Sequence, residues 1–420
     1  MHSGIDRDRA TSVTAIRQWR RMATVAMLGL IGVGGAACKG ALEVQNEQDI
    51  LDANLSAAEA VGPLLTGVAG DYAVAYGNAA DIVGLFGGEL IHTGSFPSWR
   101  EVEGGYGRRP STEGDNMYNQ IERAIWVADT AAVRIGKVAA DPTKSPEVAS
   151  AKIYGAFGTL LLADNFCQGT IKSGPALSDD SLYRRAEGLF TDAIAIATAA
   201  GRDSLRLRAL AGRARTRLML KNYSGARDDA TLIPGTFRFN AIYSSNSTRE
   251  NNSVATLTTT LIRREAGVNP RFYKNATYVA DPRTPFRNKG DTAKGPDPIR
   301  QFVEQLKYPQ RDTPIAISSW QEARLIEAEA ENQLGNSARA VTLINQVRAA
   351  ANLPAYAGGL SQAEVLAQIR YERSAELWLQ AQSVVDERRF NDAYLATPHD
   401  QCFAIGQREW DSNPLSHNGS

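Results

Sequence analysis

The chain has few of the side chains that carry most enzyme chemistry. Its 420 residues include three cysteines and four histidines, and the histidines are scattered without the spacing of metal ligands. The sequence also lacks a Gly-x-Ser-x-Gly elbow, a phosphate-binding glycine loop and a Cys-x-x-Cys pair. We therefore expect no catalytic residue, no metal site and no cofactor.

An excess of charge of one sign is also missing. The 46 basic residues balance the 46 acidic residues, so the formal net charge is zero. Nucleic-acid binding depends on a concentrated basic face, and we exclude nucleic acid as a partner. Apolar residues make up 43% and charged residues 22% of the chain, proportions that are typical of a globular protein.

The N-terminal apolar run, at residues 22–33, is too short to stay in a bilayer as a spanning helix. Three arginines between positions 17 and 21 precede it, and small residues lie directly before Cys38. This order predicts a bacterial lipoprotein signal peptide over residues 1–37, with Cys38 lipidated as the first mature residue. A plain secretory signal with an incidental cysteine is the alternative, and the true start codon can also lie downstream, at Met22.

Two cysteines remain besides Cys38, namely Cys167 and Cys402. Outside the cytoplasm an even pair of cysteines favours a disulfide. Such a bond would join the end of the chain to its early helices. Two separate buried thiols are the alternative, because the sequence does not give the distance between the two sulfurs.

Most of the chain has the hydrophobic spacing of amphipathic helices, in steps of three and four residues. The strongest stretch covers residues 318–389. It predicts two antiparallel helices separated by Gly335-Asn336, and then a third, long helix that opens with a capping box at Ser361. Further helices are predicted at residues 51–76, 116–135, 145–166 and 182–200, with a second hairpin within residues 206–235.

The two hairpins share a spacing of small residues. Ala214 and Ala226 are twelve residues apart, and so are Ala328 and Ala340. Tetratricopeptide hairpins place small side chains at this interval so that their helices can approach closely. The predicted fold class is therefore mostly all-α, with tetratricopeptide-like helical hairpins, long irregular loops and a C-terminal helical segment at residues 319–395.

Two stretches interrupt the helical pattern. Residues 234–318 lack periodicity and are predicted to be an irregular insertion, in which the many aromatic residues argue against disorder. Residues 92–115 form a loop rich in glycine and proline. Flat aromatic faces beside polar groups suit sugar binding. The candidate ligand-binding residues are Phe96, Trp99, Arg100, Tyr106, Tyr273 and Tyr278. For Trp99 the alternative is packing on the helices beneath.

Two carboxylates, Glu372 and Glu376, fall on one face of a predicted helix, an arrangement that acid–base catalysis can use. Arg373 and two later arginines at 388–389 offer them ion-pair partners. We therefore predict a structural ion network at this place and a protein that is not an enzyme.

In the order of its parts, the chain resembles the SusD/RagB family of outer-membrane nutrient-binding lipoproteins. After the signal that ends at Cys38, residues 117–129 look like the family's Tyr-x-x-Ile-x-x-Ala-Asn helix. Residues 320–353 look like its second-half helix pair, residues 371–377 contain its Glu-Arg-x-x-Glu-Leu motif, and residues 403–419 resemble its closing segment. One departure is Gln380-Ala381, where the family usually has Glu-Gly.

The resemblance implies one SusD-like α-helical domain over residues 38–420. It also implies a lipoprotein of the cell outer membrane, lipid-anchored and exposed at the surface. Such a protein would bind a glycan or another nutrient and deliver it to a partner TonB-dependent transporter of the SusC type. The hairpins and the short chain leave an alternative, a helical-repeat scaffold lipoprotein that binds protein partners and no sugar. A hydrolase that uses Glu372 and Glu376 is the third hypothesis.

Overall fold

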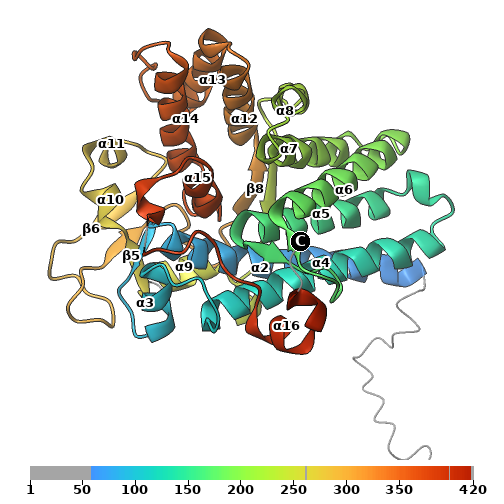
Figure 1. The fold of residues 1–420 in the computed structure, drawn as a ribbon, viewed down its shortest axis with the longest axis horizontal. Helices are drawn as coiled ribbons and strands as arrows, with labels where there is room; N and C mark the ends of the chain where they lie inside the picture. The colour runs from blue at the N-terminus through green and yellow to red at the C-terminus, as the bar shows by residue number, and fades with distance from the viewer. Residues whose placement is uncertain (1–57, 261–262, 397, 418–420) are drawn as a thin grey trace, which may run out of the picture. The chain divides into compact units, whose positions relative to one another are not determined.

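The computed structural model describes residues 58–260, 263–396 and 398–417 (Figure 1). The predicted signal peptide and Cys38 lie outside the described residues, as does the start of the first predicted helix. All that follows concerns the unit from Leu55 to Ser420. Across the described ranges, none of the helices combines the length and the apolar character needed to cross a membrane.

The described chain is mainly helical, as predicted. The α-helices are α2 (Val61–Phe86), α3 (Pro97–Glu103), α4 (Thr112–Val138), α5 (Pro146–Asn165), α6 (Asp179–Ala199), α7 (Asp203–Met219), α8 (Tyr223–Thr231), α9 (Ser253–Thr258), α10 (Pro270–Tyr273), α11 (Ala276–Val279), α12 (Trp320–Gln333), α13 (Ser337–Ala350), α14 (Gln362–Glu376), α15 (Ser383–Arg389) and α16 (Gln407–Ser412). The strands are β1 (Leu90–His92), β2 (Gln168–Gly169), β3 (Leu177–Ser178), β4 (Arg238–Ala241), β5 (Ala266–Val268), β6 (Phe286–Asn288), β7 (Val303–Gln305) and β8 (Ile315–Ser319).

The longer helices form a stack, in which each packs on the one before it. Helix α4 packs on α2, and α5, α6, α7, α8, α12 and α13 follow in that order (Figure 1). Both predicted hairpins are present, as α7–α8 and α12–α13. The alanines that set their spacing, Ala214, Ala226, Ala328 and Ala340, are all fully buried. Small side chains thus let neighbouring helices pack closely, which confirms the predicted fold class.

Short polar signals set several helix boundaries. The hydroxyl of Ser145 accepts a hydrogen bond from the N–H of Val148 and caps α5, whose first residue is Pro146. Ser361 and Glu364 form the predicted capping box at the start of α14. These local contacts explain why the sequence alone located the helix starts.

The prediction of one long helix after Ser361 is wrong beyond Glu376. The chain leaves the helix there, turns, and starts α15 at Ser383. Leu379 and Ala381 both adopt the left-handed backbone conformation, with φ of 56°. A helix cannot continue through such residues, because L side chains pay a steric cost of about 1–2 kcal/mol each in this region.

Contacts from distant parts of the chain hold this turn in place. A carboxylate oxygen of Glu89 accepts from the N–H of Leu379 at 3.1 Å. The Lys307 ammonium donates to the carbonyls of Glu376 at 2.9 Å and Trp378 at 2.8 Å. Glu89 and Lys307 are remote in sequence from the turn, so helical periodicity could not reveal the break.

The segment predicted as an irregular insertion, residues 234–318, is built from short strands and helices among its described residues. Strand β5 pairs antiparallel with β1, which follows α2, and Leu90 lies opposite Val268. Strand β4 pairs with β8, which leads directly into α12, and β6 pairs with β7. The pairing of β4 with β8 joins the two ends of the segment to each other, and the pairing of β5 with β1 attaches its middle to the chain that follows α2.

A buried ion pair joins α7 to α12. Arg215 donates from Nε and Nη2 to the two oxygens of Glu322 at 2.5 and 2.7 Å, and from Nη2 to the carbonyl of Ile317 at 2.6 Å. Glu322 also accepts from Ser318 Oγ at 2.9 Å and from Gln382 Nε2 at 3.3 Å. The two charged side chains are only 5% and 1% exposed. Full hydrogen bonding is what makes such burial tolerable.

The end of the chain is fixed to the end of α5. Cys167 and Cys402 form a disulfide with Cα atoms 5.3 Å apart. Beside it, the N–H of Cys167 donates to the carbonyl of Phe403, and the N–H of Phe403 donates to the carbonyl of Asn165, each at 2.9 Å. The disulfide therefore lies within a bridge of backbone hydrogen bonds.

The left-handed turn before α15 yields a stability prediction. Ala381→Gly removes the Cβ that makes a φ of 56° costly, and we expect it to raise the free energy of unfolding by about 0.5–1 kcal/mol. Ala375→Gly, inside α14, is the matched control and should lower the free energy of unfolding by about 1 kcal/mol. Urea denaturation measures both. Equal destabilisation by the two glycines would contradict the assignment.

The buried ion pair yields a second prediction. Arg215→Met leaves the carboxylate of Glu322 buried without its guanidinium, and we expect a loss of about 3–5 kcal/mol in the free energy of unfolding. The double variant with Glu322→Met removes both charges and should lose less than either single variant. Arg227→Met, in an exposed pair, should change stability by less than about 0.5 kcal/mol. Additive losses in the double variant would refute this coupling.

Candidate ligand-binding site

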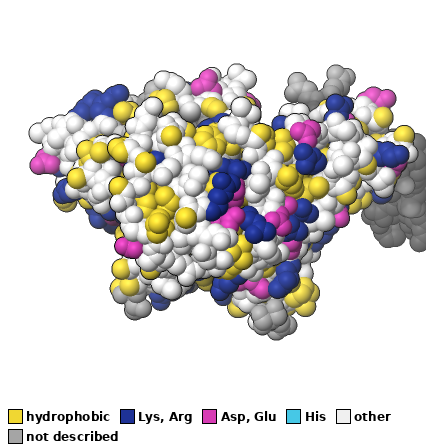
Figure 2. Space-filling model, turned by 90° about the horizontal axis from the view of Figure 1, so that it is seen from above, with side chains coloured by type: hydrophobic (Ala, Val, Ile, Leu, Met, Phe, Trp, Pro, Cys, Tyr) yellow, Lys and Arg dark blue, Asp and Glu magenta, His cyan; other side chains and the backbone are white. Residues whose placement is uncertain are grey.

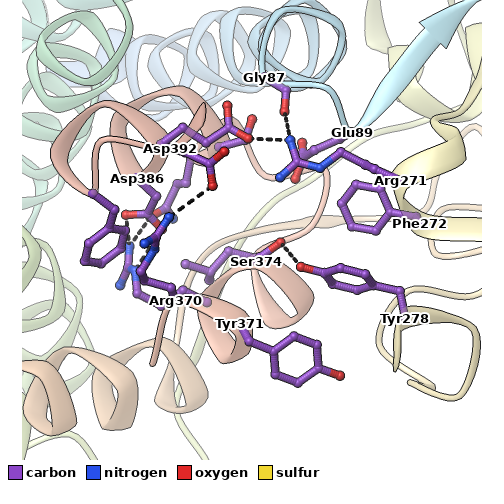
Figure 3. Close-up of a pocket in the computed structure, with 16 residues that line it drawn as sticks. Gly87, Glu89, Arg271, Phe272, Tyr278, Arg370, Tyr371, Ser374, Asp386 and Asp392 are labelled. Atoms are coloured by element: carbon purple, nitrogen blue, oxygen red, sulfur yellow. Dashed lines mark hydrogen bonds and ion pairs between the residues drawn. The ribbon is translucent and has the colours of Figure 1, made fainter. Parts of the chain in front are cut away.

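A polar pocket lies between α14, α15 and the segment that carries α10 and α11 (Figure 3). Its volume is about 210 Å³. Aromatic rings from Phe272, Tyr278 and Tyr371 form one side, and charged side chains of α14 and α15 form the other. The hydroxyls of Tyr278 and Ser374 are hydrogen-bonded across the pocket at 2.9 Å.

Each arginine that lines the pocket is paired with a carboxylate. The ion pairs are Arg271–Glu387 at 2.7 Å, Arg370–Asp392 at 3.1 Å and Arg373–Asp386 at 2.8 Å. The guanidinium of Arg271 also donates to the carbonyl of Gly87 at 3.3 Å. These pairs connect α10, α14 and α15 to the end of α2, so the charges of the pocket serve the packing of the fold.

Among the lining carboxylates, Glu89 has no ion pair within the described part of the chain. One oxygen accepts from Leu379, and the other has no hydrogen-bond partner there. Burial raises the pKa of Glu89 to about 7, against the lowering effects of the Leu379 N–H and the charges of Lys307 and Arg271. Burial likewise lowers the pKa of Lys307 to about 8. Protonation can therefore change here near neutral pH.

The cluster around Glu372 is an ion network, as expected, but with different partners. Glu372 is fully buried and accepts from Arg283 at 2.7 Å, from Arg348 at 2.6 Å and from Gln368 at 2.6 Å. Arg373, the expected partner, binds Asp386 of α15. Both oxygens of Glu372 are thus occupied by donors, so this side chain is held in place as part of the structure.

Three predicted ligand residues belong to α3 and its start. Trp99 is 4% exposed and packs in the core, which is the alternative weighed for it. Phe96 is half-buried, with its ring 6.0 Å from that of Trp99 and the guanidinium of Arg263 over it at 4.6 Å. Arg100 is half-exposed and forms an ion pair with Asp297 at 2.6 Å. Phe96 and Arg100 remain accessible to a ligand.

The other three predicted residues lie outside α3, although the N–H of Tyr106 donates to the carbonyl of Glu101 in that helix at 3.0 Å. Tyr106 is half-buried with Arg108 over its ring at 5.4 Å. Tyr273 is half-buried beside Phe286, with ring centroids 6.3 Å apart. Tyr278 lines the polar pocket. The structure therefore does not gather the six predicted residues into one pocket.

Charged side chains of both signs are mixed over the surface. On the face drawn in Figure 2, basic and acidic side chains lie beside one another, and neither sign forms a continuous field. In the described ranges, no three His, Cys, Asp or Glu side chains are placed to hold a metal ion. Electrostatic attraction of a strongly charged polymer has no structural basis on this face.

Comparison with known proteins relates part of the chain to a family. The sequence model of the SusD family matches residues 238–404. Over this stretch the chain is similar to the SusD/RagB family. No curated protein matches the sequence at a significant level.

Solved structures agree with this assignment of fold. A SusD superfamily protein from Bacteroides vulgatus has a TM-score of 0.64 at 16% identity, covering 85% of this chain and 97% of its own. One from Bacteroides thetaiotaomicron has a TM-score of 0.63 at 15% identity, covering 87% and 98%. A SusD-like carbohydrate binding protein from Bacteroides vulgatus has a TM-score of 0.56 at 15% identity, covering 78% and 82%. At these identities the likeness shows the fold.

The SusD/RagB motif at residues 371–377 has a structural role in this chain. Its first glutamate and its arginine are Glu372 and Arg373, the two residues that bind α13 and α15 to α14 through Arg348 and Asp386. The sequence did not reveal the polar pocket beside this motif, because its lining comes from three distant stretches, residues 87–89, 271–278 and 370–392. The only sign of this pocket in the sequence was the high density of charged residues between positions 370 and 392.

The raised pKa of Glu89 predicts a pH-dependent stability. Between its ordinary value of 4.5 and about 7, the folded protein keeps a proton that the unfolded chain releases, so rising pH disfavours folding. The difference in unfolding free energy between wild type and Glu89→Gln should change by up to about 1.4 kcal/mol per pH unit in this window. Urea denaturation at pH 5, 6 and 7 measures it. The exposed Glu101→Gln is the control, and parallel pH profiles for wild type and Glu89→Gln would contradict the shift.

Proposed function

We propose that this protein captures a glycan or another nutrient at the surface of the outer membrane and delivers it to a TonB-dependent transporter of the SusC type. The observation that carries the proposal is the fold, since this chain covers nearly the full length of solved SusD superfamily proteins. One structure of that fold is described as a SusD-like carbohydrate binding protein. Sugar is therefore the first ligand class to test.

Membrane attachment rests on the sequence pattern at the N-terminus. A lipoprotein signal over residues 1–37 would leave Cys38 lipidated. The several acyl chains of a bacterial lipoprotein hold a protein firmly on a membrane, whereas one chain binds weakly. The helical unit that follows would then face the medium from which the nutrient comes.

Binding, and not hydrolysis, is the chemistry that the carboxylates support. Glu372 accepts from three donors, so it has no free oxygen to serve as a general base or nucleophile. Burial raises the pKa of the neighbouring Glu376, and Arg283 lies 3.8 Å from it. This network keeps α13 and α14 together, which is a structural task.

We place ligand contacts of this function on the half-exposed aromatic rings of Phe96, Tyr106 and Tyr273, with Arg100 as a hydrogen-bond donor. Aromatic faces pack on the C–H surfaces of sugars, and polar side chains bind the hydroxyls. Trp99 supports Phe96 from the core, and Tyr278 belongs to the small polar pocket. Because Trp99 is buried, a Trp99→Ala variant would lower stability, and a loss of binding in it could not be assigned to a lost ligand contact.

The partner is tested by purifying the native protein from outer membranes under mild detergent. We expect a TonB-dependent barrel to co-purify with it, because a capture protein must hand its cargo to a channel. Its identity is read by mass spectrometry of the complex. Repeated isolation of the protein without any such barrel would refute the delivery step.

The ligand is tested by titration calorimetry against oligosaccharides. We expect binding of at least one sugar, with affinity lowered about tenfold by Phe96→Ala or Tyr273→Ala, which corresponds to about 1.4 kcal/mol. Tyr356→Ala, a half-buried tyrosine on another loop, is the matched control and should leave affinity unchanged. Equal affinities in all variants would remove these residues from the site.

The scaffold function remains the second candidate, and the stacked hairpins favour it. Tetratricopeptide-like stacks present extended surfaces that bind other proteins. Co-purification of a soluble or membrane partner other than a barrel, together with no sugar binding, would select this function.

A further inference from the structure

A cavity of about 560 Å³ lies on another part of the surface, between α4 and α16. Residues 172–173, in the turn after β2, form part of its wall. Its volume is well above that of the polar pocket, at about 210 Å³, and falls in the range of about 300–1,000 Å³ that small-molecule sites occupy. The six candidate residues, Phe96, Trp99, Arg100, Tyr106, Tyr273 and Tyr278, do not line it.

Trp126 is the main aromatic feature of this cleft. It is 55% exposed, whereas every other Phe, Tyr and Trp side chain in the described ranges is half-buried or buried. A single exposed apolar side chain is ordinary on a protein surface. The residues around Trp126 therefore determine whether it can form part of a binding site. Asn116, Asn119, Gln120 and Arg123 precede Trp126 at helical spacing and line the same cleft.

The wall beside Trp126 contains polar atoms that the protein leaves unsatisfied. Gln120 Oε1 and Glu122 Oε1 are buried and have no hydrogen-bond partner in the part of the chain that the structure describes. Burial raises the pKa of Glu122 to about 8, and the charge of Glu409 adds to the effect. At neutral pH this carboxyl is therefore protonated and can both donate and accept hydrogen bonds.

The opposite wall is rigid and offers a free donor. Glu409 of α16 accepts from Thr170 Oγ1 and from Asn413 Nδ2, each at 2.8 Å, and the N–H of Gln407 donates to Asp115 at 2.7 Å. These bonds fix α16 against α4 and the β2 turn. The exposed guanidinium of Arg408 has neither an ion pair nor a hydrogen bond to the described residues. A ligand would meet preformed walls.

We propose that this cleft is a saccharide-binding site, in which a sugar ring stacks on Trp126 and its hydroxyls bind Gln120, Glu122 and Arg408. A flat aromatic face beside mixed donors and acceptors is what a sugar ring requires. The inference rests on the proposed function for its ligand class, and it assigns a place that is separate from Phe96 and Tyr273. The lining of the cleft has three cationic side chains, Arg123, Lys172 and Arg408, which are too few to bind the phosphates of a nucleic acid.

The test uses the full protein and four probes, maltohexaose, xylohexaose, mannohexaose and hexagalacturonate. Affinity is measured by calorimetry and by tryptophan fluorescence. For the probe that binds, Trp126→Ala should lower affinity at least about tenfold, Trp126→Phe should lower it less, and Gln120→Ala should lower it severalfold. Val133→Ala is the control, because Val133 is 56% exposed on the same helix and outside the cleft.

The outcomes separate this site from the function on which it rests. Binding that survives in Trp126→Ala but falls in Tyr273→Ala overturns the cleft and leaves nutrient capture standing. If none of the four probes binds wild type, the proposal that the cleft binds sugar is wrong. Nutrient capture is then still tested separately, by co-purification of the barrel. Because Trp126 is exposed, its variant should keep the thermal midpoint of wild type, and a tenfold loss of affinity at an unchanged midpoint supports the site.

Discussion

The buried pair of Arg215 and Glu322 is the contact on which the arrangement of the helices depends. Taking two charges out of water costs several kcal/mol each, and only a complete set of hydrogen bonds offsets that cost. Here the set is completed by the carbonyl of Ile317, the hydroxyl of Ser318 and the amide of Gln382. Helices α7 and α12, strand β8 and the start of α15 must therefore all be in place together.

The turn between α14 and α15 follows from this constraint. Gln382 reaches Glu322 only because the chain has left the helix at Glu376 and reversed through left-handed residues. The hydroxyl of Tyr76 donates to the carbonyls of Ala316 and Gln380, which ties α2 to the same place. The polar pocket is the space left beside the turn, and its ion pairs stabilise the reversal. Its volume of about 210 Å³ and its internal ion pairs leave little room for a large ligand.

Local information predicted the helices well, since capping residues and alanine spacing act over a few residues. The hairpins at Ala214 and Ala328 and the capping box at Ser361 were found in this way. The turn after Glu376 was missed, because Glu89 and Lys307, which hold it, are remote in sequence. Candidate ligand residues were chosen by aromatic content in loops, a criterion that cannot tell a buried Trp99 from an exposed ring. Trp126 was overlooked because candidates were sought in loops, and Trp126 falls within a predicted helix.

Because most charged side chains are paired with one another, the few unpaired polar groups are the ones available to bind a ligand. Most arginines of the described chain are committed to carboxylates, from Arg213 and Asp229 to Arg389 and Glu329. A fold that satisfies its charges internally has little left to attract a ligand by net field, so recognition must rely on stacking and on a few unpaired donors and acceptors. Neutral, hydroxyl-rich molecules are the ligands for which that mode of binding is sufficient. The same reasoning applies to a chain whose formal net charge is zero.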